Sequence, residues 1–185
     1  QVRKLVTLNN DIYYSVKYKG IVKLDSTKTQ EENLITEGLT DFNEDYVDFT
    51  LCEFNNTIFV GSNHGLFTIK DGKYETINSE LTKKNLFYFR LYNDHNKRLW
   101  AITFEKENAD DDNEIRAVGY FEFKDDKITH TTKPFRTLKE DIIQVIKEDL
   151  DGNLWFGGKK KAYIYNENIN LNVDNNINTI ISSIM

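Results

Sequence analysis

Residues 142–157 read IIQVIKEDLDGNLWFG and form the clearest local unit of the chain. They predict an apolar strand, a turn at Asp151-Gly152 and a second strand that opens with Leu154-Trp155. Asp-Gly between two apolar runs is a strong hairpin signal, because glycine accepts the positive φ that tight hairpin turns require. Residues 161–165, KAYIY, begin six residues beyond Trp155 and supply a third predicted strand.

The same pattern occurs three more times upstream. Residues 5–13, LVTLNNDIY, and residues 51–61, LCEFNNTIFVG, place an Asn-Asn turn between two apolar strands, and residues 91–100, LYNDHNKRLW, form the remaining copy. One aromatic residue follows the turn in each copy, at intervals of 46, 41 and 55 residues: Tyr13, Phe59, Trp100 and Trp155. An acidic run at residues 110–112 delays the third strand of the third copy and accounts for the longest interval.

A period of about 40–50 residues with about four short strands per unit is typical of β-propeller blades. We therefore predict an all-β chain of about four four-stranded antiparallel blades, with repeats at residues 1–41, 42–83, 84–138 and 139–176. Residues 178–185 align with residues 140–147, and residues 177–185 are predicted to be the first strand of a further blade. A segment of a larger propeller is expected, although four blades also suffice for a small closed ring.

One segment is ambiguous by its spacing. Leu138, Ile142, Val145 and Ile146 recur at a helical period, so an amphipathic helix over residues 138–150 is one interpretation. The repeat register favours a strand, because the corresponding positions of other copies are rich in aromatic and β-branched residues.

The composition of the chain argues against several classes of partner and site. The 185 residues include 24 Lys and Arg against 30 Asp and Glu, a net charge of −6. This acidic balance, without a basic stripe, argues against nucleic acid as a partner. No stretch reaches the roughly 18 apolar residues of a membrane span, so we expect no membrane contact by this segment. The single Cys52 excludes an internal disulfide and a Cys-based zinc site.

The fourth copy resembles the repeat of the two-component regulator propeller family. That repeat usually reads I-x-E-D-x-x-G-N-L-W-x-G-T followed by G-L-x-x-Y, and residues 146–158 read IKEDLDGNLWFGG. The copy departs from the family pattern at Gly158, in place of Thr, and at Lys161-Ala162, in place of Gly-Leu. The other copies keep parts of the pattern: VGS at 60–62, GLF at 65–67 and RLW at 98–100.

The resemblance implies a role in signalling. Proteins with this repeat are typically extracytoplasmic, periplasmic sensor regions of membrane-anchored bacterial histidine kinases, often hybrid ones, that respond to glycan fragments. They carry two propellers of roughly seven blades, a small sandwich domain, a membrane helix and a cytoplasmic kinase. By this resemblance the chain is a non-catalytic sensor segment, and kinase activity resides elsewhere. Expected partners are an oligosaccharide, the remaining blades and signalling domains of a longer chain, and a second copy in a homodimer.

Two other functions stay open. A propeller face also serves as a protein–protein interaction scaffold. A carbohydrate-active propeller enzyme, such as a polysaccharide lyase or glycosidase, needs paired acids, and the sequence places none in a defensible position. His64, His95 and His130 have no carboxylate or Cys at ligand spacing, so neither a metal nor another cofactor is expected.

Several conspicuous side chains have a structural interpretation. Asp94, Asp149 and Asp151 are interpreted as turn residues whose short side chains hydrogen-bond the backbone. Trp100 and Trp155 are interpreted as inter-blade core residues, because Tyr13 and Phe59 fill their position in other copies; sugar stacking is the alternative.

Blade geometry predicts where a ligand binds. Loops between the second and third strands of each blade, and segments between blades, share one face of a propeller. The candidate ligand-binding residues on that face are Lys17, Tyr18, Lys19, Phe42, Asn63, His64, Lys159, Lys160 and Lys161. Their lysines suit a carboxylated or sulfated sugar, with Tyr18 or Phe42 stacking on a ring. Alternatively, the lysines only keep exposed loops soluble.

Overall fold

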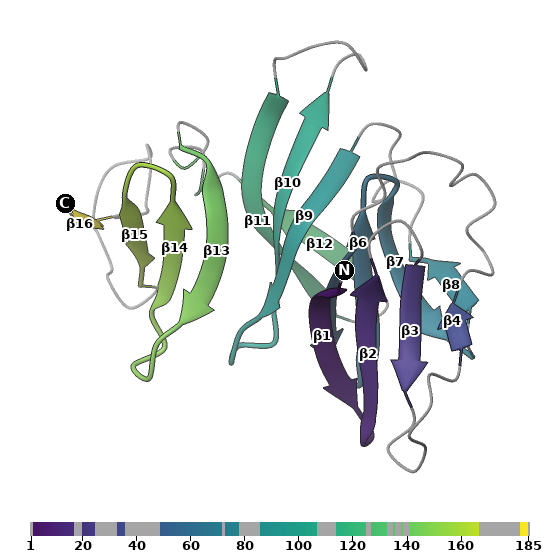
Figure 1. The fold of residues 1–185 in the computed structure, drawn as a ribbon. Coiled ribbons are helices and arrows are strands. Elements are labelled where there is room, and N and C mark those ends of the chain that lie inside the picture. The colour runs from purple at the N-terminus through teal and green to yellow at the C-terminus, as the bar shows by residue number, and fades with distance from the viewer. Residues whose placement is uncertain are drawn as a thin grey trace.

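The computed structural model describes residues 2–16, 20–24, 33–35, 49–71, 73–77, 86–106, 114–124, 127–132, 135, 138, 141–166 and 182–184. These residues form antiparallel sheets of four strands, and in each sheet the strand order follows the chain order. Figure 1 shows the sheets fanned side by side. The prediction of an all-β chain of propeller blades is confirmed.

The sheets are numbered here as blades in chain order. Blade 1 contains β1 (Val2–Leu8), β2 (Asp11–Val16), β3 (Gly20–Leu24) and β4 (Asn33–Ile35). Blade 2 contains β5 (Thr50–Phe54), β6 (Thr57–Ser62), β7 (Gly65–Lys70) and β8 (Lys73–Thr76). Blade 3 contains β9 (Leu86–Asn93), β10 (Leu99–Lys106), β11 (Glu114–Lys124) and β12 (Lys127–Thr131). Blade 4 contains β13 (Ile143–Glu148), β14 (Leu154–Gly158), β15 (Ala162–Tyr165) and β16 (Ser182–Ile184).

The last strand differs from the prediction. Residues 177–185 were expected to begin a further blade, but β16 pairs antiparallel with β15, with Ile164 opposite Ser182, and becomes the fourth strand of blade 4. Pairing there satisfies backbone groups at the free edge of β15. Apolar spacing similar to that of residues 140–147 carries no information about which edge a strand joins.

The turns take the conformations that their residues favour. Asn55 and Asn56 both have positive φ, 48° and 58°, as a two-residue type I′ hairpin requires. Gly152 has a φ of 80° in the turn of blade 4. Residues 143–148 of the ambiguous segment form β13, so the strand interpretation is confirmed.

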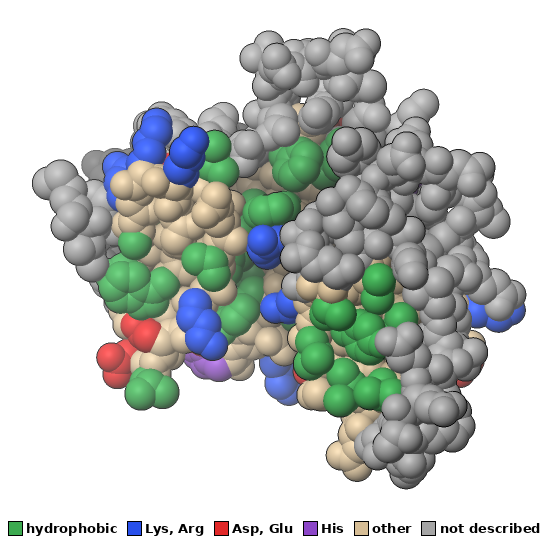
Figure 2. All heavy atoms as spheres, viewed as in Figure 1, with side chains coloured by type: hydrophobic (Ala, Val, Ile, Leu, Met, Phe, Trp, Pro, Cys, Tyr) green, Lys and Arg blue, Asp and Glu red, His purple; other side chains and the backbone are tan. Residues whose placement is uncertain are grey.

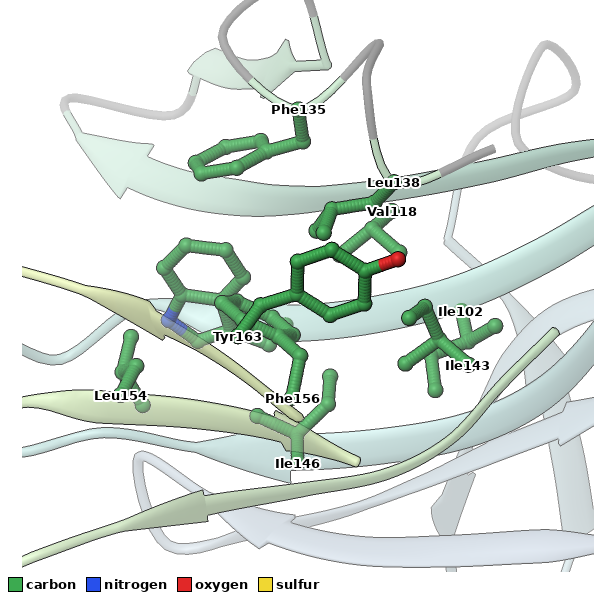
Figure 3. Close-up of a cluster of buried hydrophobic side chains, with 10 residues drawn as sticks. Ile102, Val118, Phe135, Leu138, Ile143, Ile146, Leu154, Phe156 and Tyr163 are labelled. Atoms are coloured by element: carbon green, nitrogen blue, oxygen red, sulfur yellow. The ribbon is translucent and has the colours of Figure 1, made fainter. Parts of the chain in front are cut away.

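Three apolar clusters hold neighbouring blades together. One joins blades 1 and 2 around Leu51 and Val60, the next joins blades 2 and 3 around Phe59 and Leu99, and the third joins blades 3 and 4. Figure 3 shows the third cluster, where side chains of both blades converge on Phe156. Each cluster consists of the facing sides of two sheets, so the interior of the molecule lies between blades.

The four aromatic positions do not share one environment. Phe59 and Trp100 are buried, and each packs toward the blade that follows it in the chain. Tyr13 is half-buried against the cluster of blades 1 and 2. Trp155 is also half-buried, but it lies outside all three clusters. The prediction of a core position therefore holds for Trp100 and is wrong for Trp155 within the described residues.

The orientation of Trp155 follows from strand alternation. Successive side chains of a strand point to opposite faces, and Leu154 and Phe156 enter the cluster with blade 3. Trp155 therefore lies on the opposite face of blade 4.

Within the described ranges, no helix has the length and apolar character that a membrane crossing requires.

Candidate functional site

The candidate ligand residues fall into three groups. Lys17, Tyr18, Lys19 and Phe42 lie outside the described residues. Asn63 and His64 are half-buried in the turn between β6 and β7, on blade 2. Lys159, Lys160 and Lys161, called the lysine loop below, are exposed between β14 and β15, on blade 4. Blade 3 lies between these two groups, so the structure does not gather them into one pocket (Figure 1).

A buried carboxylate fixes the backbone of the lysine loop. Asp141, only 3% exposed, precedes β13. Its Oδ1 accepts from Ile142 N–H at 2.7 Å and Lys160 N–H at 3.2 Å, and its Oδ2 accepts from Lys161 N–H at 3.3 Å. The Tyr163 hydroxyl donates to Oδ2 at 3.2 Å. One side chain therefore holds the start of β13, the loop and β15 together.

Further contacts close the loop. Lys161 O accepts from Gly158 N–H at 2.9 Å, and Ile142 O accepts from Lys159 N–H at 3.0 Å. A Cβ on Gly158 would lie 2.3 Å from Asp141 Oδ2, so only glycine allows this approach. The backbone of the loop is thus held on both sides.

Asp141 keeps its charge despite burial. Burial by itself raises the pKa of this carboxyl, but hydrogen bonds from Ile142, Lys160, Tyr163 and Lys161 outweigh it and lower the pKa. The carboxylate is therefore ionised at neutral pH and can hold its backbone donors.

The lysine side chains point the other way, into solvent. Figure 2 shows blue side chains gathered at the end of blade 4 where β14 meets β15. Lys161 Nζ lies 5.4 Å from the centroid of the Tyr163 ring, a cation–π distance. In the described part of the chain, no salt bridge involves a lysine of this loop.

The turns at the other end of the strands are built around aspartates. Asp94, 7% exposed, forms a salt bridge with Arg98 and accepts from Trp100 Nε1 at 2.7 Å. Asp149 accepts from Asp151 and Asn153 N–H, and from Trp155 Nε1 at 2.8 Å. The interpretation of Asp94 and Asp149 as turn residues is confirmed. The contact to tryptophan was missed, although both pairs have the same spacing of six residues.

A buried tyrosine was also missed. Tyr88 of β9 is 3% exposed and packs against Gly61 of β6, and a Cβ on Gly61 would lie 2.6 Å from Tyr88 Cβ. Neither its hydroxyl nor Asn63 Oδ1 has a hydrogen-bond partner among the described residues. Burial raises the pKa of Tyr88, so the hydroxyl keeps its proton. No local sequence pattern distinguishes this tyrosine from the other aromatic residues of the strands.

The histidines make structural contacts. His95 bonds Glu148 of blade 4 through its backbone N–H, at 3.1 Å, and through Nδ1. His130 stacks on Phe121 with ring centroids 4.1 Å apart. Across the ranges that the structure describes, no group of three or more His, Cys, Asp or Glu side chains is placed to hold a metal ion.

No protein-family model matches the chain, and no curated protein matches it by sequence. Two solved structures of the extracellular domain of BT4673 from B. thetaiotaomicron are similar, one described as a hybrid two-component system and the other as a one-component system. Their TM-scores are 0.62 and 0.60, both at 19% identity, over 92% and 85% of this chain. This chain spans only 21% and 20% of those chains.

A luciferin-regenerating enzyme is also similar, with a TM-score of 0.52 and 13% identity over 86% of this chain and 53% of that one. At such identities the likeness is one of fold. One fold hosts both sensors and enzymes, so function has to be argued from the site. One of the two BT4673 structures is described as the extracellular domain of a hybrid two-component system, the class of protein that the motif at residues 146–158 predicts.

Proposed function

We propose that the chain is a non-catalytic ligand-sensing segment from the extracytoplasmic region of a membrane-anchored bacterial two-component protein, and that its ligand is a carbohydrate fragment. The observation that carries this proposal is the match of the blade arrangement, over 92% of the chain, to an extracellular domain described as part of a hybrid two-component system. The repeat motif at residues 146–158 points to the same class independently.

The architecture suits a receptor. Clusters between blades fix the sheets relative to one another. The β6–β7 and β14–β15 loops lie at one end of these sheets (Figure 1). Rigid sheets with binding groups on loops are a common arrangement for recognition. Signalling requires that the ligand bind one arrangement of blades or protomers better than another, because equal affinity shifts no equilibrium.

Further blades are the proposed neighbours of this segment. Val2 and Leu5 of β1 are each 55% exposed, and Trp155 is half-buried on the face of blade 4 away from blade 3. Wherever two of the four blades are neighbours, the corresponding faces of their sheets cover each other. In the proposed longer protein, adjacent blades cover these exposed faces. Membrane and kinase domains of that protein carry the signal, and homodimerisation is one way in which ligand binding is transmitted to them.

Isothermal titration of the chain against a panel of neutral and acidic oligosaccharides tests the proposal. Saturable binding without turnover supports it. Absence of heat with every glycan overturns the carbohydrate ligand and favours an interaction scaffold. Release of new reducing ends from any glycan overturns the non-catalytic assignment.

A further inference from the structure

We propose that Lys159, Lys160 and Lys161 form a subsite for the carboxylate or sulfate groups of an acidic glycan. This inference rests on the proposed function, because it names the class of glycan that the chain recognises. Three features carry it: unbalanced charge, a fixed backbone and the donor chemistry of the loop.

The charge of the loop is not balanced by a salt bridge. The chain as a whole carries −6, yet three consecutive lysines are exposed on one short loop. None of the three lysines forms a salt bridge with another described residue. The nearby carboxylate of Asp141 faces inward and accepts hydrogen bonds from backbone N–H groups. Neighbouring like charges repel one another, and an anion placed between them removes that repulsion.

The backbone of the loop is ordered before a ligand arrives. Asp141 accepts hydrogen bonds from the backbone N–H groups of two of the three lysines. The N–H groups of Gly158 and Lys159 add hydrogen bonds to the carbonyl oxygens of Lys161 and Ile142. Lysines that serve only solubility need no such anchor. A fixed backbone lowers the conformational entropy that binding removes, and this increases affinity for a matching anion. Asp141 is therefore a positioning residue and does not touch the ligand.

The donors select the chemistry of the ligand. Each ammonium is a compact charge with three rotatable donors, which suits the oxygens of a sulfate or a carboxylate. The surrounding acidic chain disfavours a long polyanion such as nucleic acid, because most of its charges would face repulsion. A short glycan with a few anionic groups satisfies both conditions.

The test compares two triple variants of equal charge. In one, Lys159, Lys160 and Lys161 become Gln. In the other, the exposed Lys70, Lys97 and Lys127, next to turns at the opposite end of the strands, become Gln. Both are titrated with a heparin-derived hexasaccharide, an oligogalacturonate and a neutral galacto-oligosaccharide.

We expect the lysine-loop variant to bind an acidic probe at least about tenfold more weakly, the effect of losing roughly one charge-assisted hydrogen bond or more. The opposite-end variant should stay within about twofold, since exposed charges farther away than a Debye length of about 10 Å at 0.1 M salt are screened. Equal weakening by both variants overturns the subsite. If only the neutral probe binds, the subsite is overturned and the proposed function stands. If none of the probes binds, the proposed function is overturned as well.

Asp141→Asn tests the positioning role separately. An amide cannot accept the same set of N–H groups, so hydrogen exchange at the Lys160 and Lys161 amides should become faster. Affinity for the acidic probe should fall and affinity for a neutral probe should not, which a general loss of folding does not produce. If exchange accelerates and acidic binding is unchanged, the ordered backbone is irrelevant to binding and that part of the inference is wrong.

Discussion

Asp94 Oδ2 accepts a hydrogen bond from the indole Nε1 of Trp100 at 2.7 Å, six residues further along the chain. Asp149 and Trp155 repeat this contact at 2.8 Å in the next blade. The two pairs are locally alike, but Trp100 is buried between blades and Trp155 is half-exposed. Local sequence sets the turn, and the neighbouring sheet sets the burial.

Substitution of the two tryptophans should therefore have different costs. Trp100→Ala removes a fully buried ring and should lower the free energy of unfolding by about 3–5 kcal/mol. Trp155→Ala should lower it by about 1–2 kcal/mol, because part of that ring is already in water. Urea unfolding of both variants measures the difference, and equal losses would contradict the assigned burial.

The Asp94–Arg98 pair should be sensitive to neutralisation. Asp94→Asn removes the carboxylate that pairs with the buried guanidinium of Arg98 and should cost about 3–5 kcal/mol. Asp151→Asn is the matched control, because Asp151 is exposed and its substitution should change stability by less than about 0.5 kcal/mol. Chemical denaturation compares them, and a neutral effect of Asp94→Asn would show that the pair is not buried.

Acid should release the turn of blade 4. Hydrogen bonds from Trp155 and Asn153 lower the pKa of Asp149 to about 2. An aspartate whose pKa lies below its unfolded value of about 3.9 stabilises the fold above that value, and its contribution disappears as the pH falls through the folded pKa. The window of loss therefore runs from about pH 4 to about pH 2.

Carbon-13 NMR of the Asp149 carboxyl, together with the Trp155 indole N–H shift, follows this titration. The two signals should move together at the same low pH. A carboxyl that titrates near pH 4, or an indole signal insensitive to it, would contradict the hydrogen bond.

The seam between blades 2 and 3 should not accept a methyl group at Gly61. A Cβ there would lie 2.6 Å from Tyr88 Cβ and 2.8 Å from Thr50 Cγ2. Gly61→Ala should therefore cost about 1–3 kcal/mol through overpacking. In a double-mutant cycle with Tyr88→Gly, removal of the facing Cβ should recover part of the loss from Gly61→Ala. Strict additivity would show that the two residues are not in contact.

Much of the fold could be predicted from patterns in the sequence. The Asn55-Asn56 turn and the Asp151-Gly152 turn predicted hairpins, since few residues adopt positive φ at low cost. The repeat period placed the strands in blades and resolved the ambiguous residues 143–148. The turns depend on a few neighbouring residues and the period depends on recurrence along the chain, so both can be recognised in the sequence.

The remaining features depend on distant partners. Asp141 bonds residues 19 to 22 positions away, and nothing around it marks it as the anchor of the lysine loop. The half-exposure of Trp155 and the pairing of β16 depend on which sheet lies beside them. The lysine loop itself was predicted from blade geometry, and its role in binding stays a prediction, as do those of Asn63 and His64.

Nitrogen-15 NMR of the chain, titrated with whichever oligosaccharide binds in calorimetry, shows both whether a glycan is recognised and where. The account predicts saturable shift changes at the β14–β15 loop, with Lys160 and Lys161 among them, and unchanged signals at the turns that hold Asp94 and Asp149. Changes confined to those turns, or none with any glycan, would contradict it.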